Sequence, residues 1–213
     1  MADSAITQRI KELGARWEPY IIEQRRKFHA HPELGFKEFW TTEEIARELD
    51  ALGVPYERPT ETGIVATIKG TAPGAYREDG VPQRRIALRA DIDALPVDEQ
   101  TGASYASAVE GVMHACGHDC HIAMMLGAVR MLCETRDALE GEVRVLFQPA
   151  EEISSGARAF IEAGVLDGVD TIYGAHIWSE VKAGTVSVES GPRMANTDWF
   201  RVDIDGVSAH GAM

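Results

Sequence analysis

The sequence has few cysteines, which argues against a small domain held together by disulfide bonds. Only three occur among 213 residues, an odd number in a chain long enough to bury a core of its own. An excess of positive charge is also lacking, because 21 Lys and Arg stand against 34 Asp and Glu, for a formal net charge of −13. Proteins that bind nucleic acid usually carry a basic face, so we expect no nucleic-acid partner.

Long apolar runs are missing too. The chain has no stretch of about 18 consecutive apolar residues, so we expect no transmembrane helix and no membrane partner. The first residues, MADSAITQRIKELGARW, lack the apolar centre of a signal peptide. We therefore expect a cytoplasmic protein.

Motifs of several common classes of protein are absent as well. There is no G-x-S-x-G motif, which leaves serine nucleophile chemistry weakly supported. A Walker loop and a G-x-G-x-x-G motif are also missing, so nucleotide binding is not indicated. No internal repeats or low-complexity tracts occur.

What the chain does contain is an alternation of apolar strands and helices over residues 63–178. This pattern predicts an α/β fold, with a mostly parallel sheet covered by helices on both faces. The predicted strands are 63–70, 84–91, 141–152 and 171–178, and the predicted helices are 18–33, 41–53, 120–135 and 156–166.

The expected helix ends follow from local signals. Pro19 suits a helix start, because its missing N–H costs nothing there. Thr41 and Glu44 have the spacing of a capping box, and Gly53 suits the other end of that helix. Asp119 lies directly before the helix predicted at 120–135, where it acts as an N-cap or has a further role.

The pattern changes near residue 184. Segments 184–190 and 197–206 alternate as strands do, with no helix between them. We place a boundary near Gly191 and Pro192. Residues 1–191 form the first domain, and residues 192–213 begin a second one.

Polar side chains gather where predicted strands end, at Asp91, at Glu151 and Glu152, and at His176. Ligand sites in parallel sheets lie at the carboxyl ends of strands. Two adjacent buried acids would be costly without a cation. Because neighbouring residues at a strand end point in different directions, one glutamate can bind a metal while the other lies in the cleft.

The segment HACGHDCH, residues 114–121, holds three histidines, two cysteines and an aspartate. Such side chains bind transition metals. Cys116 and His118 are two residues apart and can reach the same ion. Cys120 and His121 are interpreted as supporting or structural residues, and His114 either orients a ligand or contacts substrate. A closed, non-catalytic zinc site and a thiol redox pair of Cys116 and Cys120 are the alternatives.

These segments resemble one known family. The matching motifs are HPELGFKE (31–38), RADIDALPVDEQTG (89–102), GVMHACGHDCH (111–121), FQPAEE (147–152), GAH (174–176) and SAHGAM (208–213). In this order they resemble the M20 metallopeptidase family, in the amidohydrolase branch that includes hippurate, N-acyl-amino-acid and auxin-conjugate hydrolases.

The resemblance implies a catalytic domain with two divalent metal ions and an inserted lid domain that forms a homodimer. By position, the metal ligands it implies are Cys116 (bridging), His118, Glu152 and His176. It also implies that Glu151 is the general acid/base, that Asp91 orients the site, and that His210 of the lid reaches the partner subunit's active site.

The implied reaction is hydrolysis of an N-acyl amino acid or small peptide by a metal-activated water. A thiolate ligand favours Zn, Mn, Co or Ni over Mg or Ca. Two departures from the family pattern, Cys120 and the pair Ser208-Ala209, affect positioning and remove no ligand. Members of this family continue beyond the point that corresponds to Met213, so the resemblance implies a fragment that lacks a last ligand and is inactive alone.

Overall fold

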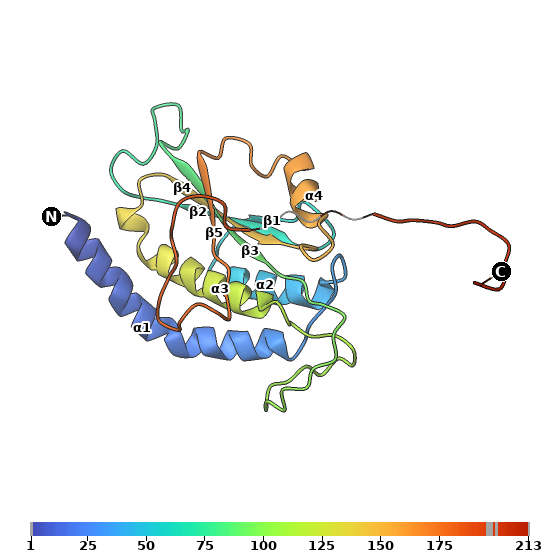
Figure 1. Cartoon of the computed structure of the whole chain (residues 1–213). Coiled ribbons are helices and arrows are strands. Elements are labelled where there is room, and N and C mark those ends of the chain that lie inside the picture. Colours follow the sequence, from blue (N-terminus) through green and yellow to red (C-terminus); the bar gives the residue numbers. More distant parts are fainter. Residues whose placement is uncertain (1, 195–197, 199, 213) are drawn as a thin grey trace. The chain divides into compact units, whose positions relative to one another are not determined.

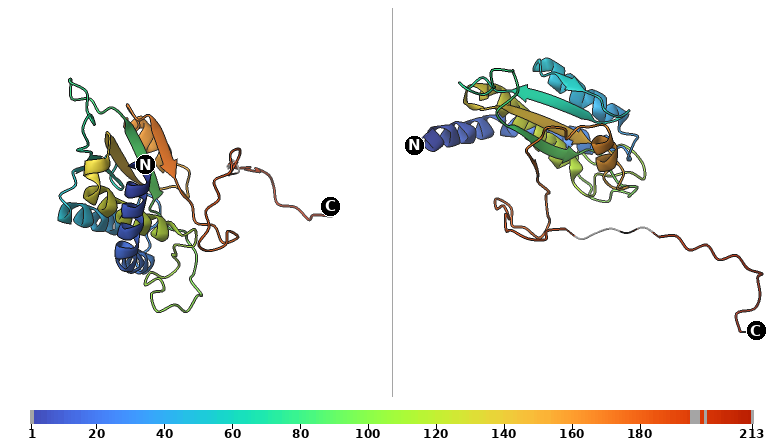
Figure 2. Two further views of the ribbon diagram at one scale, coloured as in Figure 1. Left: turned by 90° about the vertical axis from the view of Figure 1, so that its left-hand side faces the viewer. Right: turned by 90° about the horizontal axis from the view of Figure 1, so that it is seen from above.

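Five strands form one sheet, in a computed structural model that describes residues 2–194, 198 and 200–212. The strand order is β1-β2-β4-β3-β5. β3 pairs in parallel with β4 and β5, whereas β2 pairs antiparallel with β1 and β4. All strands except β2 therefore run in one direction, as predicted, and Figure 2 shows β2, β4 and β3 side by side. The strands are β1 (Tyr56–Glu57), β2 (Ile64–Lys69), β3 (Arg85–Asp91), β4 (Glu142–Gln148) and β5 (Thr171–Gly174).

Helices cover both faces of this sheet, which confirms the predicted α/β architecture (Figure 1). Helices α1, α2 and α3 lie on one face and α4 on the other. Alternate residues of β4 divide between the two sides: Val145 and Phe147 join the larger core, and Leu146 packs with Phe160 of α4. The helices are α1 (Ala2–His29), α2 (Phe39–Ala51), α3 (His118–Glu134) and α4 (Gly156–Glu162), with a short 3₁₀ turn at Arg136–Ala138.

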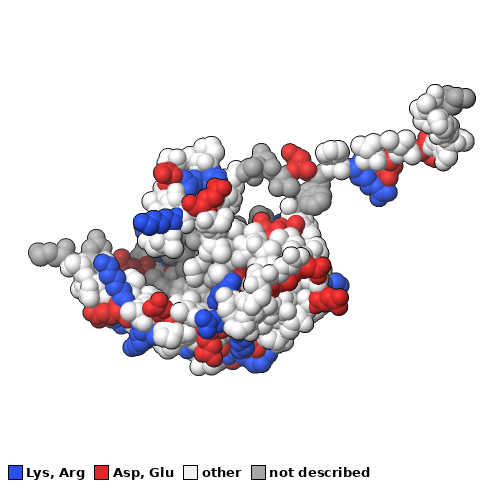
Figure 3. All heavy atoms as spheres, turned by 60° about the horizontal axis from the view of Figure 1, so that its bottom comes forward, with Lys and Arg blue, Asp and Glu red and all other residues white. Residues whose placement is uncertain are grey.

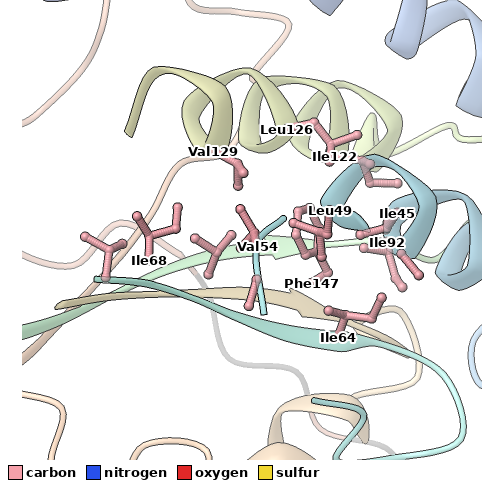
Figure 4. Close-up of a cluster of buried hydrophobic side chains, with 14 of the residues drawn as sticks. Ile45, Leu49, Val54, Ile64, Ile68, Ile92, Ile122, Leu126, Val129 and Phe147 are labelled. Atoms are coloured by element: carbon pink, nitrogen blue, oxygen red, sulfur yellow. The ribbon is translucent and has the colours of Figure 1, made fainter. Parts of the chain in front are cut away.

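The larger core lies between the sheet and helices α2 and α3 (Figure 4). Ile122 and Leu126 of α3 point toward Phe147 of β4, and all three are fully buried. Burying one such side chain contributes about 1.5–3 kcal/mol. This packing fixes α3, and with it the segment that precedes it, against β3 and β4.

The predicted helix start near Pro19 is wrong, because α1 begins at Ala2 and contains Pro19 in its interior. Contacts with the end of α3 hold the first half of α1 in place: the Trp17 indole N–H donates to Glu134 at 2.7 Å. Proline removes one backbone hydrogen bond and bends a helix. Figure 1 shows α1 changing direction along its length.

The predicted N-caps of α2 and α3 are also wrong, whereas Gly53 follows the end of α2 as predicted, with a φ of 61°. Helix α2 begins at Phe39, so Thr41 lies inside it. The carboxylate of Glu33 accepts the N–H groups of Trp40 at 3.1 Å and Thr41 at 2.8 Å, and thus replaces the expected cap. Helix α3 begins one residue before Asp119, after Gly117, which has a left-handed backbone (φ 87°).

The chain divides into two compact units, Met1–Ile177 and Trp178–Met213. The predicted domain boundary at residues 191–192 falls inside the second unit and stays a prediction. Segments 184–190 and 200–206 form no strand in the described part of the chain, and the predicted strand residues 197 and 199 lie outside it. Alternation alone does not make a strand, because each strand needs a hydrogen-bonded neighbour.

Acidic and basic side chains are interspersed on the face drawn in Figure 3. Among the described residues, no helix is both long and apolar enough to cross a membrane.

Candidate metal centre

The candidate site lies at the carboxyl ends of β3 and β4. After β3 the chain continues to α3 on one face of the sheet, and after β4 it continues to α4 on the other. Adjacent strands with connections on opposite faces leave a crevice between their carboxyl ends. Asp91 is the last residue of β3, Glu151 and Glu152 follow β4, and His176 follows β5. The sheet therefore brings the predicted polar strand ends to one edge.

His118 occupies the centre of the site. Its Nδ1 donates to the backbone carbonyl of Asp93 at 2.9 Å, so when the ring is neutral its lone pair is on Nε2. This Nε2 atom is buried and has no hydrogen-bond partner among the described residues. It lies 3.9 Å from the Glu151 carboxylate and 3.8 Å from that of Glu152.

Two sets of side chains that share His118 have the spacing of metal ligands. One ligand atom from each of Cys116, His118 and His176 lies within 4.8 Å of the others, and the same is true of His118, Glu151 and Glu152. The Cys116 sulfur is 3.4 Å from Nε2 of His176, whose Nδ1 donates to the Ile177 carbonyl at 2.5 Å. Sulfur, nitrogen and oxygen donors around a buried nitrogen that has no hydrogen-bond partner in the described part of the chain fit a divalent cation.

A third set, Asp91, His118 and His121, also meets this spacing, but His121 is not available as a ligand. Its Nε2 accepts the backbone N–H of Ile177 at 3.0 Å. Its Nδ1 must then carry the proton, which it donates to Asp91 at 2.5 Å. His121 thus fixes the chain next to His176, which agrees with its predicted supporting role.

Asp93 is a site residue that the sequence analysis missed. Its side chain accepts the backbone N–H of Glu152 at 2.9 Å, and its own carbonyl accepts the His118 proton. One buried residue thus orients two candidate ligands. The signal was present in the segment DID, because Asp91 and Asp93 are two residues apart and lie on one side of an extended chain.

The charges of the site favour a cation. Burial raises the pKa of Asp91, but the hydrogen bond from His121 and the charges of His118 and Arg89 outweigh it, so the pKa falls to about 2. Burial lowers the pKa of His118, but Asp93, Cys116 and Asp91 raise it to about 11. Burial also raises the pKa of Glu152. Acidic groups that favour a proton on His118 would equally favour a metal ion there.

The two adjacent glutamates differ in exposure. The Glu151 side chain is 41% exposed, whereas that of Glu152 is 19% exposed. The less exposed carboxylate has its backbone fixed by Asp93, and the more exposed one lies where substrate and water can reach it. The predicted roles, Glu152 as a metal ligand and Glu151 in proton transfer, stay predictions.

The remaining residues of the 114–121 segment lie beside the site. Asp119 accepts a hydrogen bond from His29 at 2.7 Å and forms an ion pair with Arg25 at 3.0 Å, so it links α3 to α1. His114 is buried, which lowers its pKa to about 4, and its two ring nitrogens have no partner among the described residues. The three cysteines are free thiols.

His210 belongs to the second unit, where its Nδ1 accepts the N–H of Ala212 at 3.2 Å. Its predicted role in a partner's active site stays a prediction.

Comparison with known proteins identifies the family of this chain. The model of peptidase family M20/M25/M40 matches residues 87–211, which include every candidate site residue. The chain belongs to this family. The suspected M20 relationship is therefore confirmed.

The chain is similar to named relatives that include a carboxypeptidase and an amidohydrolase. The chain is 42% identical to thermostable carboxypeptidase 1 of Saccharolobus solfataricus over 97% of its own length and 51% of that protein. It is also 42% identical to an N-acyl-L-amino acid amidohydrolase of Geobacillus stearothermophilus, over 97% of its length and 54% of that protein. The chain thus spans about half the length of the curated M20 relatives it matches.

A solved M20 structure has a similar fold. It is a Bacillus subtilis protein described as a dinuclear metal-binding peptidase of the M20 family. The TM-score is 0.75 at 44% identity, with 85% of this chain and 48% of that chain covered.

Proposed function

We propose that this protein hydrolyses the amide bond of N-acyl amino acids or small peptides, with two divalent metal ions and with Glu151 as the general acid/base. The observation that carries the proposal is the buried Nε2 of His118, which accepts no hydrogen bond from any residue that the structure describes and lies beside both glutamates. The names of the amidohydrolase and carboxypeptidase relatives support an amide substrate.

Cys116, His118, Glu152 and His176 would hold the metal ions. When bound, such ions make water a better nucleophile near neutral pH and polarise the carbonyl that is attacked. A thiolate among the donors favours Zn²⁺, Mn²⁺, Co²⁺ or Ni²⁺ over Mg²⁺ or Ca²⁺.

The chain's own residues would move and direct the proton. Glu151 takes a proton from the attacking water and gives it to the departing amine nitrogen. Asp91 stays ionised at neutral pH, since its pKa is about 2, and it keeps the His121 ring oriented. His121 and Asp93 in turn hold the backbone beside His176 and Glu152.

The test uses the longest gene product that contains this sequence. The protein is freed of metal with a chelator, reloaded with each of the four metals, and assayed with a panel of N-acyl amino acids and dipeptides. We expect loss of hydrolysis on chelation with the fold retained, and recovery on reloading. Unfolding on chelation, with no hydrolysis by any loaded form, would instead support a non-catalytic zinc-binding module. A homodimer and a cytoplasmic location stay predictions.

A further inference from the structure

The motif HPELGFKE, residues 31–38, lies against the turn that carries Glu151 and Glu152, although none of its residues belongs to the proposed machinery. The backbone carbonyl of Glu33 accepts the N–H of Ala94 at 2.8 Å, and Leu34 forms a parallel bridge to Ala94. The motif is thereby fixed to the segment that follows β3.

Ala150, the residue before the two glutamates, has an unusual backbone. Its φ is 52°, in the left-handed region that residues with a Cβ atom rarely adopt. Its carbonyl accepts the N–H groups of Ser155 at 3.3 Å and Gly156 at 3.1 Å. The backbone direction at Ala150 decides where the next two side chains point, so something must hold this conformation.

Two residues of the motif contact Ala150. Glu38 is fully buried, and its Oε1 accepts the Ala150 N–H at 2.8 Å. A Cβ atom on Gly35 would lie 3.1 Å from the Cα of Ala150 and 3.3 Å from its Cβ. The absence of a side chain at Gly35 therefore lets Ala150 lie close against the motif.

Glu38 is itself held firmly. Its carbonyl accepts the N–H of Thr42 at 2.9 Å and the hydroxyl of the same residue at 2.6 Å. It immediately precedes α2, which packs in the larger core. Helix α2 is thus connected through one carboxyl group to the turn with the candidate site residues.

We propose that Glu38 is a positioning residue that holds Ala150 in its left-handed conformation and so directs the carboxylates of Glu151 and Glu152 into the metal site. This inference rests on the proposed function. A purely structural Glu38 would affect the free energy of unfolding but not, in the folded protein, the affinity for metal.

The test compares two substitutions of similar size. Glu38→Gln keeps an oxygen that accepts the Ala150 N–H, whereas Glu38→Met fills the same volume without one. Burial raises the pKa of Glu38, so a neutral amide is a close substitute. Co²⁺ titration followed by the thiolate absorption band reports metal affinity, and urea unfolding reports stability. We expect Glu38→Met to weaken Co²⁺ binding about 10–100-fold, the usual effect of losing a residue that orients a ligand, and Glu38→Gln to stay within about threefold of wild type.

Ala150→Gly tests whether Glu38 acts on the metal site through the backbone of Ala150, because glycine adopts positive φ without strain. The loss caused by Glu38→Met should be several times smaller in the Ala150→Gly background. The inference would be overturned if Glu38→Met lowered the Co²⁺ affinity equally in both backgrounds. It would also be overturned if Glu38→Gln and Glu38→Met lowered that affinity equally.

Gly35→Ala provides a second variant if Glu38→Met does not fold. Its added Cβ would lie 3.1 Å from the Cα of Ala150 and in ordinary contact, at 3.4 Å, with Oδ2 of Asp93, and we expect the crowding at Ala150 to weaken Co²⁺ binding. Wild-type affinity in folded Gly35→Ala, or in folded Glu38→Met, would overturn the inference alone. A wild-type protein that binds no Co²⁺ would overturn the proposed function as well.

Discussion

Asp93 accepts a hydrogen bond from the backbone N–H of Glu152, over 2.9 Å, although the two residues lie on different strand connections. The same aspartate accepts the Nδ1 proton of His118 with its main-chain carbonyl. Two candidate ligands from separate segments thus depend on one residue that does not need to contact a metal.

Replacing Asp93 with Ala should weaken metal binding. The Glu152 N–H would lose its buried acceptor, and the ligand would lose its fixed direction. We expect Co²⁺ affinity to fall about 10–100-fold, measured by titration at neutral pH. Asp79→Ala, in an exposed loop, is the control and should bind Co²⁺ as wild type does. Unchanged affinity in Asp93→Ala would show that Glu152 needs no such support.

The two adjacent glutamates should respond differently to the same change. Glu151→Gln should keep its metal and lose about 10²–10⁴-fold in kcat, the usual contribution of a positioned acid/base. Glu152→Gln should lose metal, because an amide is a poorer ligand than a carboxylate. Metal analysis and turnover of an N-acyl amino acid check both variants. Loss of metal in Glu151→Gln, with metal retained in Glu152→Gln, would reverse the assignment.

Cys116 and Cys133 form a matched pair of thiols. Cys116→Ser should weaken metal binding, because serine is a harder and poorer ligand than thiolate. Cys133 packs against the main core, so Cys133→Ala should leave the metal content unchanged and cost only stability. Metal analysis after dialysis separates the two variants. Should Cys133→Ala alone lose metal, the site would be misplaced.

Glu99 should make stability depend on pH. Burial raises its pKa, but the Ser107 N–H at 2.6 Å, the Thr101 hydroxyl and His29 lower it to about 2, from an ordinary value of 4.5. A carboxyl group with a lowered pKa stabilises the fold fully above its unfolded pKa, and this contribution disappears as the pH falls through the folded pKa.

Glu99→Gln should therefore be less stable than wild type above about pH 4.5. The difference should shrink between about pH 4.5 and pH 2. Urea unfolding across this range gives the result, with Glu61→Gln at an exposed position as the control. A difference that does not change with pH would argue against this account.

Much of the fold could be predicted from local pattern. The alternation of apolar residues gave β2 and β4, and the apolar repeat of α3 gave a buried helix, because these signals arise within a few residues. The polar strand ends Asp91 and His176 could be placed together, since parallel strands align their carboxyl ends.

The errors arose where distant residues decide the outcome. Pro19 lies inside α1 because contacts with the end of α3 hold the preceding turns. Glu33 replaced the expected Thr41 cap through a contact that no local motif signals. Glu38 was missed for the same reason, since its importance comes from a hydrogen bond to the loop after β4.

The candidate ligands lie at the start of α3 and in the segments that follow β4 and β5, so only a chain in which these elements are already packed together presents them at one place. A metal ion held there would favour the folded chain over the unfolded one, by about 2.7 kcal/mol when free metal is 100 times its Kd. Cellular proteases remove the unfolded population. Metal supply would then govern how long each molecule survives, and starvation for metal would lower the abundance of the protein as well as its turnover.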